Sequence, residues 1–371
     1  MTIKETEQEL LDKYVCKVPF RHIEIFEGRT HLCCASWLDT PIKHKFDKDG
    51  NEDIDVWNAE LTKDIRRSVL NGSYKYCNKK LCPHLSTLIN TGKPTGWLVE
   101  KDRLPYKDWD GFIIPNSDTM DSTPASINFT FDRSCNLKCP SCRVELIMAK
   151  PGKVDKINTT LDFINNNYAE NVRKIFITGS GDPFASKSFR KFLQEFDYKK
   201  YPNLQDLSLS TNGILFNKKQ WDLIKNAHPY IKTVEISIDA ATKNTYENVT
   251  RLGGNWEILM DNLEFVNSIE SIENLRLSFV VQQSNYKEMY DFTNLIIDKF
   301  KSRLETQRTK QNTIVYFGQI APWEALTAES YKKQAVAEPT HPEHNELIKE
   351  VGKVFTLSNQ IKIESNLTNL L

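Results

Sequence analysis

From residue 125 onward, short apolar runs rich in β-branched and aromatic residues alternate with longer runs in which apolar residues recur every three or four positions. This alternation is typical of parallel βα units, and it constrains the fold more than any other feature of the chain. It predicts strands at 126–132, 174–179, 206–211, 233–238, 275–281 and 313–318. It predicts helices at 155–167, 186–196, 217–226, 256–269 and 287–300. Six such units predict an α/β fold, a partial (β/α)6 barrel.

Three cysteines follow the first expected strand with the spacing C-x3-C-x2-C: Cys135, Cys139 and Cys142. Their position places them on the loop that leaves the end of the strand. A tetrahedral zinc site or a fully thiolate-ligated cluster needs four protein ligands. Three thiolates instead suit a four-iron cluster that keeps one iron open for a substrate or cofactor.

These residues resemble the radical S-adenosylmethionine (radical SAM) superfamily, whose three-cysteine loop follows the first strand of a partial (β/α) barrel. The resemblance implies a [4Fe-4S] cluster held by Cys135, Cys139 and Cys142, with the open iron binding the amine and carboxylate of S-adenosylmethionine. An aromatic residue often precedes the last cysteine in the family, but this chain has Ser141 there. That difference weakens an expected adenine contact and leaves the iron ligands unchanged.

Polar residues follow several of the expected strands, at the ends where barrels of parallel strands carry their chemistry. Residues 178–183 resemble the family's glycine-rich motif, with Ser180 in place of a glycine and Asp182 in place of a glutamate. Residues 239–262 resemble the branch of the family that carries auxiliary clusters, in which an arginine at the position of Arg251 meets the cofactor carboxylate. The cofactor contacts implied by the resemblance are Gly179, Ser180, Gly181, Asp182, Pro183, Ser210, Asn212, Ser237, Asp239, Arg251, Val281 and Gln282. Ordinary βα turns and a solvated surface arginine are the alternatives.

All eight cysteines precede residue 143, and five of them precede the barrel: Cys16, Cys33, Cys34, Cys77 and Cys82. Together with Trp57-Asn58 and Ile65-Arg66 they resemble the twitch/SPASM auxiliary-cluster pattern, here placed before the barrel instead of after it. The resemblance implies a second [4Fe-4S] cluster on Cys16, Cys33, Cys77 and Cys82. Cys34 should face the opposite way if 30–34 is a strand. Zinc on the same four thiolates is the alternative.

The remaining features set the domain organisation and limit the partners. We expect an auxiliary cluster domain at 1–84, a bridging segment at 85–124, the barrel at 125–321 and a C-terminal extension at 322–371, with a helix at 342–353 and a strand near 361–364. Lysine plus arginine and aspartate plus glutamate number 49 each, so charge favours neither nucleic acid nor an anionic membrane. No run approaches the roughly 20 apolar residues of a membrane span. A soluble, cytoplasmic protein is expected.

The resemblance implies reductive cleavage of S-adenosylmethionine to a 5′-deoxyadenosyl radical that abstracts hydrogen from a substrate. The substrate would be a sugar-like small molecule or a peptide, and the auxiliary cluster would accept the electron left behind. An external donor such as flavodoxin or ferredoxin would supply the reducing electron. Two alternatives remain: a zinc-stabilised interaction module on an inert α/β scaffold, and a two-cluster electron carrier with no nucleoside pocket.

Overall fold

The computed structural model describes residues 6–26, 29–34, 37–38, 42–43, 56–305, 312–323 and 325–367. The acidic stretch at 46–54 lies outside the described residues. The chain forms two compact units. Unit 1 comprises residues 1–132, 150–176 and 197–205, and unit 2 comprises residues 133–149, 177–196 and 206–371. The boundaries of these two units differ from those of the four segments that we expected from the sequence. The four expected segments stay a prediction.

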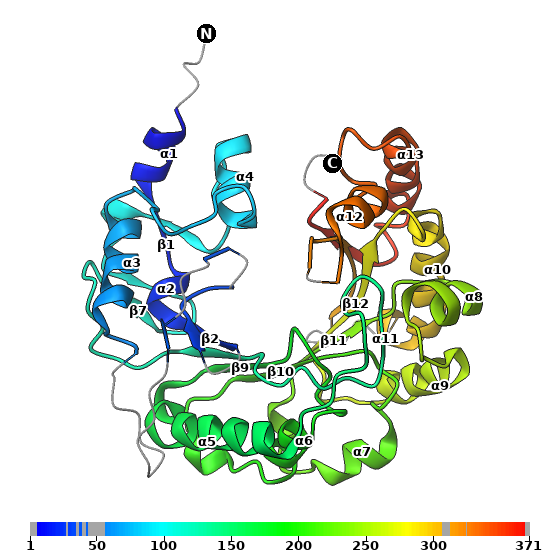
Figure 1. The fold of residues 1–371 in the computed structure, drawn as a ribbon, viewed down its shortest axis with the longest axis horizontal. Helices are drawn as coiled ribbons and strands as arrows, with labels where there is room; N and C mark the ends of the chain where they lie inside the picture. The colour runs from blue at the N-terminus through cyan, green and yellow to red at the C-terminus, as the bar shows by residue number, and fades with distance from the viewer. Residues whose placement is uncertain are drawn as a thin grey trace. The chain divides into compact units, whose positions relative to one another are not determined.

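Unit 2 is built on five parallel strands in the order β14-β13-β12-β11-β10. The strands are β10 (Asp206–Thr211), β11 (Thr233–Ser237), β12 (Asn274–Val281), β13 (Asn312–Gln319) and β14 (Lys362–Ser365). The helices include α6 (Lys187–Gln194), α7 (Lys218–Leu223), α8 (Lys243–Thr245), α9 (Trp256–Asn267), α10 (Met289–Lys299), α11 (Lys301–Glu305), α12 (Ala328–Gln334) and α13 (His344–Phe355). Helix α10 packs against both α9 and α13 (Figure 1).

Aromatic side chains form the centre of the core between the sheet of unit 2 and α10. The ring centroid of Phe279 lies 5.1 Å from that of Phe292 and 5.6 Å from that of Phe317. All three residues are at most 1% exposed. On β11 the apolar residues Val234 and Ile236 are buried and alternate with half-buried polar ones, as a half-covered strand requires. Burial of one face fixes the register, and therefore which strand ends lie side by side.

Unit 1 contains a second set of strands, in which β2 (His22–Phe26) pairs parallel with β8 (Ser126–Phe129) and antiparallel with β3 (Arg29–His31). Strand β3 also pairs with β4 (Ile42–Lys43), β1 (Tyr14–Cys16) with β5 (Leu98–Glu100), and β6 (Tyr106–Lys107) with β7 (Ile113–Ile114). Strand β9 (Lys174–Ile177) belongs to this unit except for its last residue. The helices are α1 (Glu7–Lys13), α2 (Val18–Arg21), α3 (Glu60–Leu70), α4 (Pro83–Thr91) and α5 (Pro151–Asn167).

The six expected barrel strands are all present, and the α/β fold with parallel strands is consistent with a partial barrel. The strand on which the argument about Cys34 depended does not extend through 30–34, because β3 ends at His31 and the cysteines that follow it are not on a strand. Helix α4 and the short strands β5, β6 and β7 lie within the expected bridging segment at 85–124 or overlap it.

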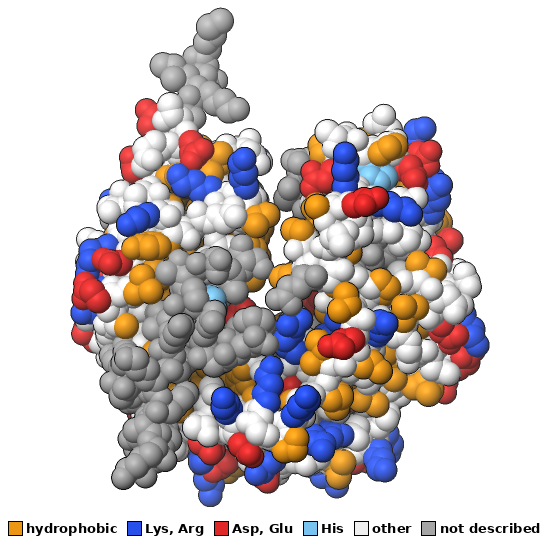
Figure 2. All heavy atoms as spheres, viewed as in Figure 1, with side chains coloured by type: hydrophobic (Ala, Val, Ile, Leu, Met, Phe, Trp, Pro, Cys, Tyr) orange, Lys and Arg blue, Asp and Glu red, His pale blue; other side chains and the backbone are white. Residues whose placement is uncertain are grey.

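The distribution of charged side chains on the surface matches the equal numbers of basic and acidic residues in the sequence. Basic and acidic side chains are interspersed over the face shown in Figure 2. Among the described residues, no helix is both long enough and apolar enough to span a membrane.

Candidate functional site

The three-cysteine loop in unit 2 is closed by backbone hydrogen bonds. Cys142 N and Arg143 N both donate to Cys139 O, at 2.9 and 3.0 Å, and so form a turn that joins the second and third cysteines. Cys135 N donates to Ile147 O at 2.9 Å and closes the loop around them. Leu137 is fully buried and packs with Cys135 and Cys139, which anchors the loop in the core. The sequence therefore brings the three thiols together on one short, tied segment.

Each of the three sulfur atoms accepts a hydrogen bond from a nitrogen. Asn212 Nδ2 lies 3.7 Å from Cys135 Sγ, and Arg143 Nη2 lies 3.5 Å from Cys142 Sγ. Arg251 Nη1 lies 3.4 Å from Cys139 Sγ. Two of these donors are cationic, and a cation beside a sulfur favours the thiolate form that metals bind.

Burial opposes ionisation of two of these thiols while no metal is bound. It raises the pKa of Cys135 to about 11, with a further rise from the nearby Asp182 carboxylate. Burial also raises the pKa of Cys139, and the positive charge of the Arg251 guanidinium opposes this rise. Ligation of a metal therefore has to displace protons from these thiols.

The donor set fits an iron–sulfur cluster held by three thiolates. The three cysteines are soft ligands on one loop, and each sulfur has the N–H partner that cluster ligands use. Across the described residues, no three His, Cys, Asp or Glu side chains already stand in a metal-coordinating arrangement.

The Asp182 carboxylate clamps the turn after β9 onto the end of β10. Its Oδ1 accepts from Phe184 N at 2.9 Å and Ala185 N at 3.2 Å, and its Oδ2 accepts from Thr211 Oγ1 at 2.7 Å and Asn212 N at 2.9 Å. The side chain is fully buried. Four protein donors therefore surround the oxygens of Asp182, and the cofactor contact that the sequence implied for it stays a prediction.

The rest of this turn is also held by protein groups. Thr178 Oγ1 accepts from Ser180 N at 3.0 Å and Gly181 N at 2.9 Å, so two amides expected to meet a ligand are already bonded. Ser180 O accepts from Arg143 Nη2 at 2.7 Å. Gly179 is exposed and Pro183 is buried.

Asp239 and Arg251 form a buried ion pair at the end of β11. Arg251 Nη2 lies 2.8 Å from Asp239 Oδ2, and Asp239 Oδ1 accepts from Val280 N at 2.7 Å. Asp239 has φ +61°, a left-handed conformation that non-glycine residues rarely adopt. The alternative interpretation of Arg251 as a solvated surface arginine is wrong, because this residue is only 9% exposed.

The remaining predicted contacts lie along the same strand ends. Ser237 Oγ lies 3.0 Å from Ser278 Oγ, and Ser210 is half-buried near the end of β10. Val281 is fully buried, and Gln282 N donates to Asn285 Oδ1 at 2.8 Å. A cofactor role for these residues stays a prediction.

Sequence reasoning missed three residues of this site. Arg143 bridges the cysteine loop and the turn after β9. Its position directly after Cys142 in the sequence could have identified it as a site residue. Asn285 ties β11 to β12 by donating to Asp239 O at 3.0 Å and Val280 O at 2.9 Å. Tyr246 lies fully buried before Arg251, and no local pattern distinguishes it from a core tyrosine.

All five N-terminal cysteines belong to unit 1. The pKa of Cys33 is raised by burial first, and then by the charges of Cys16, Cys82, Cys34 and Cys77, so these five thiols lie within electrostatic reach. Burial, followed by the charge of Cys82, raises the pKa of Cys77 to about 12. Both Cys33 and Cys34 lie beyond the end of β3, so strand alternation does not separate them.

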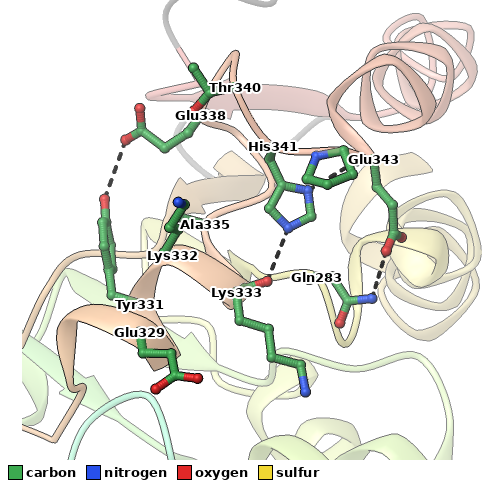
Figure 3. A pocket seen from close by; sticks show the side chains of 11 residues that line it. Gln283, Glu329, Tyr331, Lys332, Lys333, Ala335, Glu338, Thr340, His341 and Glu343 are labelled. Atoms are coloured by element: carbon green, nitrogen blue, oxygen red, sulfur yellow. Dashed lines mark hydrogen bonds between the residues drawn. The ribbon is translucent and has the colours of Figure 1, made fainter.

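A cavity of about 680 Å³ lies elsewhere in unit 2, near the carboxyl ends of β12 and β13 (Figure 3). Its lining includes Gln283, Tyr331, Glu338, His341 and Glu343. Gln283 Nε2 donates to Glu343 Oε1 at 2.8 Å, and Tyr331 Oη donates to Glu338 Oε1 at 3.3 Å. The segment 322–371, to which the sequence assigned no role, thus supplies most of this lining.

Comparison with known proteins gives a family for the barrel region. Residues 130–296 match the pattern of the Radical SAM superfamily. The chain is 30% identical over 191 residues to GTP 3′,8-cyclase of Alkaliphilus metalliredigens, covering 48% of this chain and 55% of that protein. It is 26% identical over 221 residues to Molybdenum cofactor biosynthesis protein 1 of Dictyostelium discoideum, covering 58% of this chain and 33% of that protein. The chain thus spans about half the length of the first relative and a third of the second.

Two solved structures align with most of the chain at low similarity. SuiB of Streptococcus suis bound to S-adenosylmethionine has a TM-score of 0.43 at 13% identity, covering 95% of this chain and 72% of that chain. anSMEcpe with bound AdoMet and Cp18Cys peptide has a TM-score of 0.40 at 18% identity, covering 64% of this chain and 62% of that chain.

Proposed function

Because this chain belongs to the radical SAM superfamily, with residues 130–296 as its family domain, we propose that it is an enzyme that cleaves S-adenosylmethionine and abstracts hydrogen from a substrate. A [4Fe-4S] cluster on Cys135, Cys139 and Cys142, when bound, supplies the electron that yields the 5′-deoxyadenosyl radical. The observation that carries this proposal is the three-thiol loop in which every sulfur has its own N–H donor. An inert scaffold would not need that arrangement.

The surrounding residues hold this site in one geometry. Asp182 fixes the turn after β9 against β10, and Arg143 fixes the cysteine loop against that turn. Asp239 orients Arg251 toward Cys139. Such prior ordering lowers the cost of bringing the reacting groups together, which is the protein's part when a cofactor carries the chemistry.

We extend the proposal to a second [4Fe-4S] cluster on Cys16, Cys33, Cys77 and Cys82. A cluster with four protein ligands has no open iron, so its natural role is to accept an electron after hydrogen abstraction. That role favours a net two-electron oxidation or crosslink. Grouped thiols also require a reduced compartment, so the proposal includes a cytoplasmic location and a flavodoxin or ferredoxin as donor.

For the substrate, the cavity beside β12 and β13 favours a small molecule. Its volume of about 680 Å³ lies within the range of small-ligand sites. The similarity to proteins named GTP 3′,8-cyclase points the same way, and a peptide is the second candidate. One residue of the lining, Gln283, follows the predicted cofactor contact Gln282 directly, and Gln283 N donates to Gln334 O at 3.0 Å.

Anaerobic purification and replacement of the three loop cysteines test the proposal. The wild-type protein should be brown and should form 5′-deoxyadenosine from S-adenosylmethionine when reduced. The Cys135→Ala, Cys139→Ala, Cys142→Ala triple variant should lose this product and about four irons per chain, while keeping iron in unit 1. A colourless protein with zinc and no iron would favour the interaction module, and two clusters without cofactor cleavage would favour the electron carrier.

A further inference from the structure

The segment of unit 1 that carries Cys77 and Cys82 departs from the balanced charge of the whole chain. Residues 65–99 contain six basic residues and no Asp or Glu, although basic and acidic residues number 49 each in the full sequence. Lys75, Lys80 and Lys93 are exposed and form no ion pair with any described residue. A surface whose positive charge is uncompensated attracts acidic partners.

Two large apolar side chains are exposed on the same segment. Leu81 is 50% exposed and Trp97 is 40% exposed. Asn78 Oδ1 accepts from Lys80 N at 3.2 Å and from Leu81 N at 3.0 Å, so it fixes the turn that carries both side chains. Exposed apolar and aromatic side chains with charged residues around them are typical of a protein interface.

Trp97 lies beside segments that carry two of the N-terminal cysteines. Strand β1 ends at Cys16 and pairs antiparallel with β5, and the next residue, Lys17, donates its N–H to Trp97 O at 2.9 Å. The ring of His84, two residues after Cys82, has its centroid 6.1 Å from that of Trp97. A partner seated on this indole would therefore lie against the segments that carry both cysteines.

The ring contact of Trp97 is held in place by further bonds. Thr95 Oγ1 lies 3.1 Å from His84 Nδ1, within hydrogen-bond distance. The His84 ring also meets Trp37 edge-on, with centroids 5.9 Å apart, and Trp37 O accepts from Asn78 N at 2.7 Å. The indole of Trp97 is thus fixed while part of its surface stays exposed.

The position beside the cysteines selects the kind of partner. In the proposed function, the cluster site of unit 1 takes up an electron after hydrogen abstraction, and that electron has to leave before the next turnover. Electron-transfer complexes are small and weak, so two apolar side chains within a basic rim suffice. A nucleic acid also favours lysines and an indole, but its binding would not require contact with the cysteine segments.

We propose that five exposed residues of unit 1 form a docking surface for an acidic one-electron carrier protein of the ferredoxin class. They are Lys75, Lys80, Leu81, Lys93 and Trp97, here called the Trp97 surface. One electron passes from the cluster site of unit 1 to the oxidised carrier, and no bond or proton changes. This inference rests on the proposed function.

The test is binding of a strongly acidic plant-type [2Fe–2S] ferredoxin to the anaerobically reconstituted full chain, measured by calorimetry. The Lys80→Glu, Lys93→Glu double variant should weaken binding roughly tenfold at about 10 mM salt and less at about 150 mM, where the Debye length falls from about 30 to about 8 Å. Trp97→Ala should weaken binding roughly tenfold at both salt concentrations. Lys219→Glu and Trp323→Ala are the matched controls, because they change an exposed lysine and an exposed tryptophan of unit 2, and they should leave the affinity unchanged.

Iron content and cleavage of S-adenosylmethionine with dithionite are recorded for every variant. The lysine variants should keep both, so that their loss of affinity reports the surface and not a lost cluster. The docking surface alone is overturned if wild type does not bind ferredoxin, if the Trp97 surface variants bind it unchanged, or if the controls lose as much. Tighter binding of a single-stranded oligonucleotide through the same residues overturns it as well. A wild-type protein without iron, or without cleavage under dithionite, overturns the proposed function and the docking surface with it.

Discussion

The Nη1 atom of Arg251 lies 3.4 Å from the sulfur of Cys139, although the two residues are 112 positions apart in the chain. The same guanidinium is paired with Asp239 through Nη2. A cation is therefore fixed beside the Cys139 thiol by a carboxylate at the end of β11. This relationship makes the end of β11 part of the cysteine site.

Replacement of Asp239 by asparagine should destabilise unit 2 strongly. The amide can still accept from Val280 N, but it leaves the buried Arg251 charge unpaired, which typically costs about 3–5 kcal/mol. Urea unfolding followed by circular dichroism measures the effect. Asp222→Asn is the control, because it breaks an exposed pair with Lys218 and should leave the unfolding midpoint in place. Equal midpoints for both variants would contradict the buried pair.

Replacement of Gly213 by alanine should also destabilise unit 2, for two separable reasons. Gly213 has φ +81°, and a left-handed backbone costs an alanine about 1–2 kcal/mol. Its Cβ would also lie 2.8 Å from Leu259 Cδ1 and 3.0 Å from Ile236 Cγ2, and overpacking typically costs about 1–3 kcal/mol. Gly92→Ala isolates the backbone part, because Gly92 has φ +70° and nothing within 4 Å of a Cβ. The difference between the two unfolding free energies measures the packing part, and no difference would refute it.

The strands of the barrel region were predictable because their pattern is local. In β11 and β12, buried apolar residues such as Ile236 and Leu277 recur at alternate positions. The position of the cysteine loop after a strand was predictable for the same reason, since three cysteines stand within eight residues. The hydrogen bonds of Asp182 could not be predicted from the sequence. Its partners Thr211 and Asn212 lie 29 and 30 positions away, so they come into contact with it only in the folded chain.

The choice between Cys33 and Cys34 shows a different limit of sequence reasoning. The argument from side-chain alternation needs a strand that continues through both residues, but β3 ends at His31. The chain then turns, with Trp37 N donating to Cys34 O at 2.9 Å. Where a strand stops after three residues depends on its partners, which composition does not specify.

A histidine in unit 1 should make stability depend on pH. Burial, followed by the charges of Arg21 and Lys174, lowers the pKa of His22 to about 4, below its ordinary value of 6.5. Between these values the unfolded chain binds more protons than the folded one, so stability rises with pH by at most about 1.4 kcal/mol per unit. The contribution is complete above pH 6.5 and is lost as pH falls toward 4.

Urea midpoints of wild type and His22→Gln between pH 4 and 8 test this dependence. Glutamine can still bond Ser126 Oγ, which lies 2.8 Å from His22 Nδ1, but it cannot titrate. The variant should therefore have a smaller pH slope below 6.5 and the same slope as wild type above 7. Parallel curves over the whole range would assign the acid sensitivity to other groups.

Replacement of Cys77 by alanine should remove the auxiliary cluster and spare the catalytic one. The thiol of Cys77 shares its surroundings with Cys82 and Cys16 in unit 1, whereas Cys135, Cys139 and Cys142 belong to unit 2. The variant should lose about half its iron and keep uncoupled cleavage of S-adenosylmethionine. Cys34→Ala is the matched control, and it should keep both clusters if Cys33 is the ligand. Full iron in Cys77→Ala, or loss of a cluster in Cys34→Ala, would reassign the fourth ligand, because four thiolates suffice to close such a site.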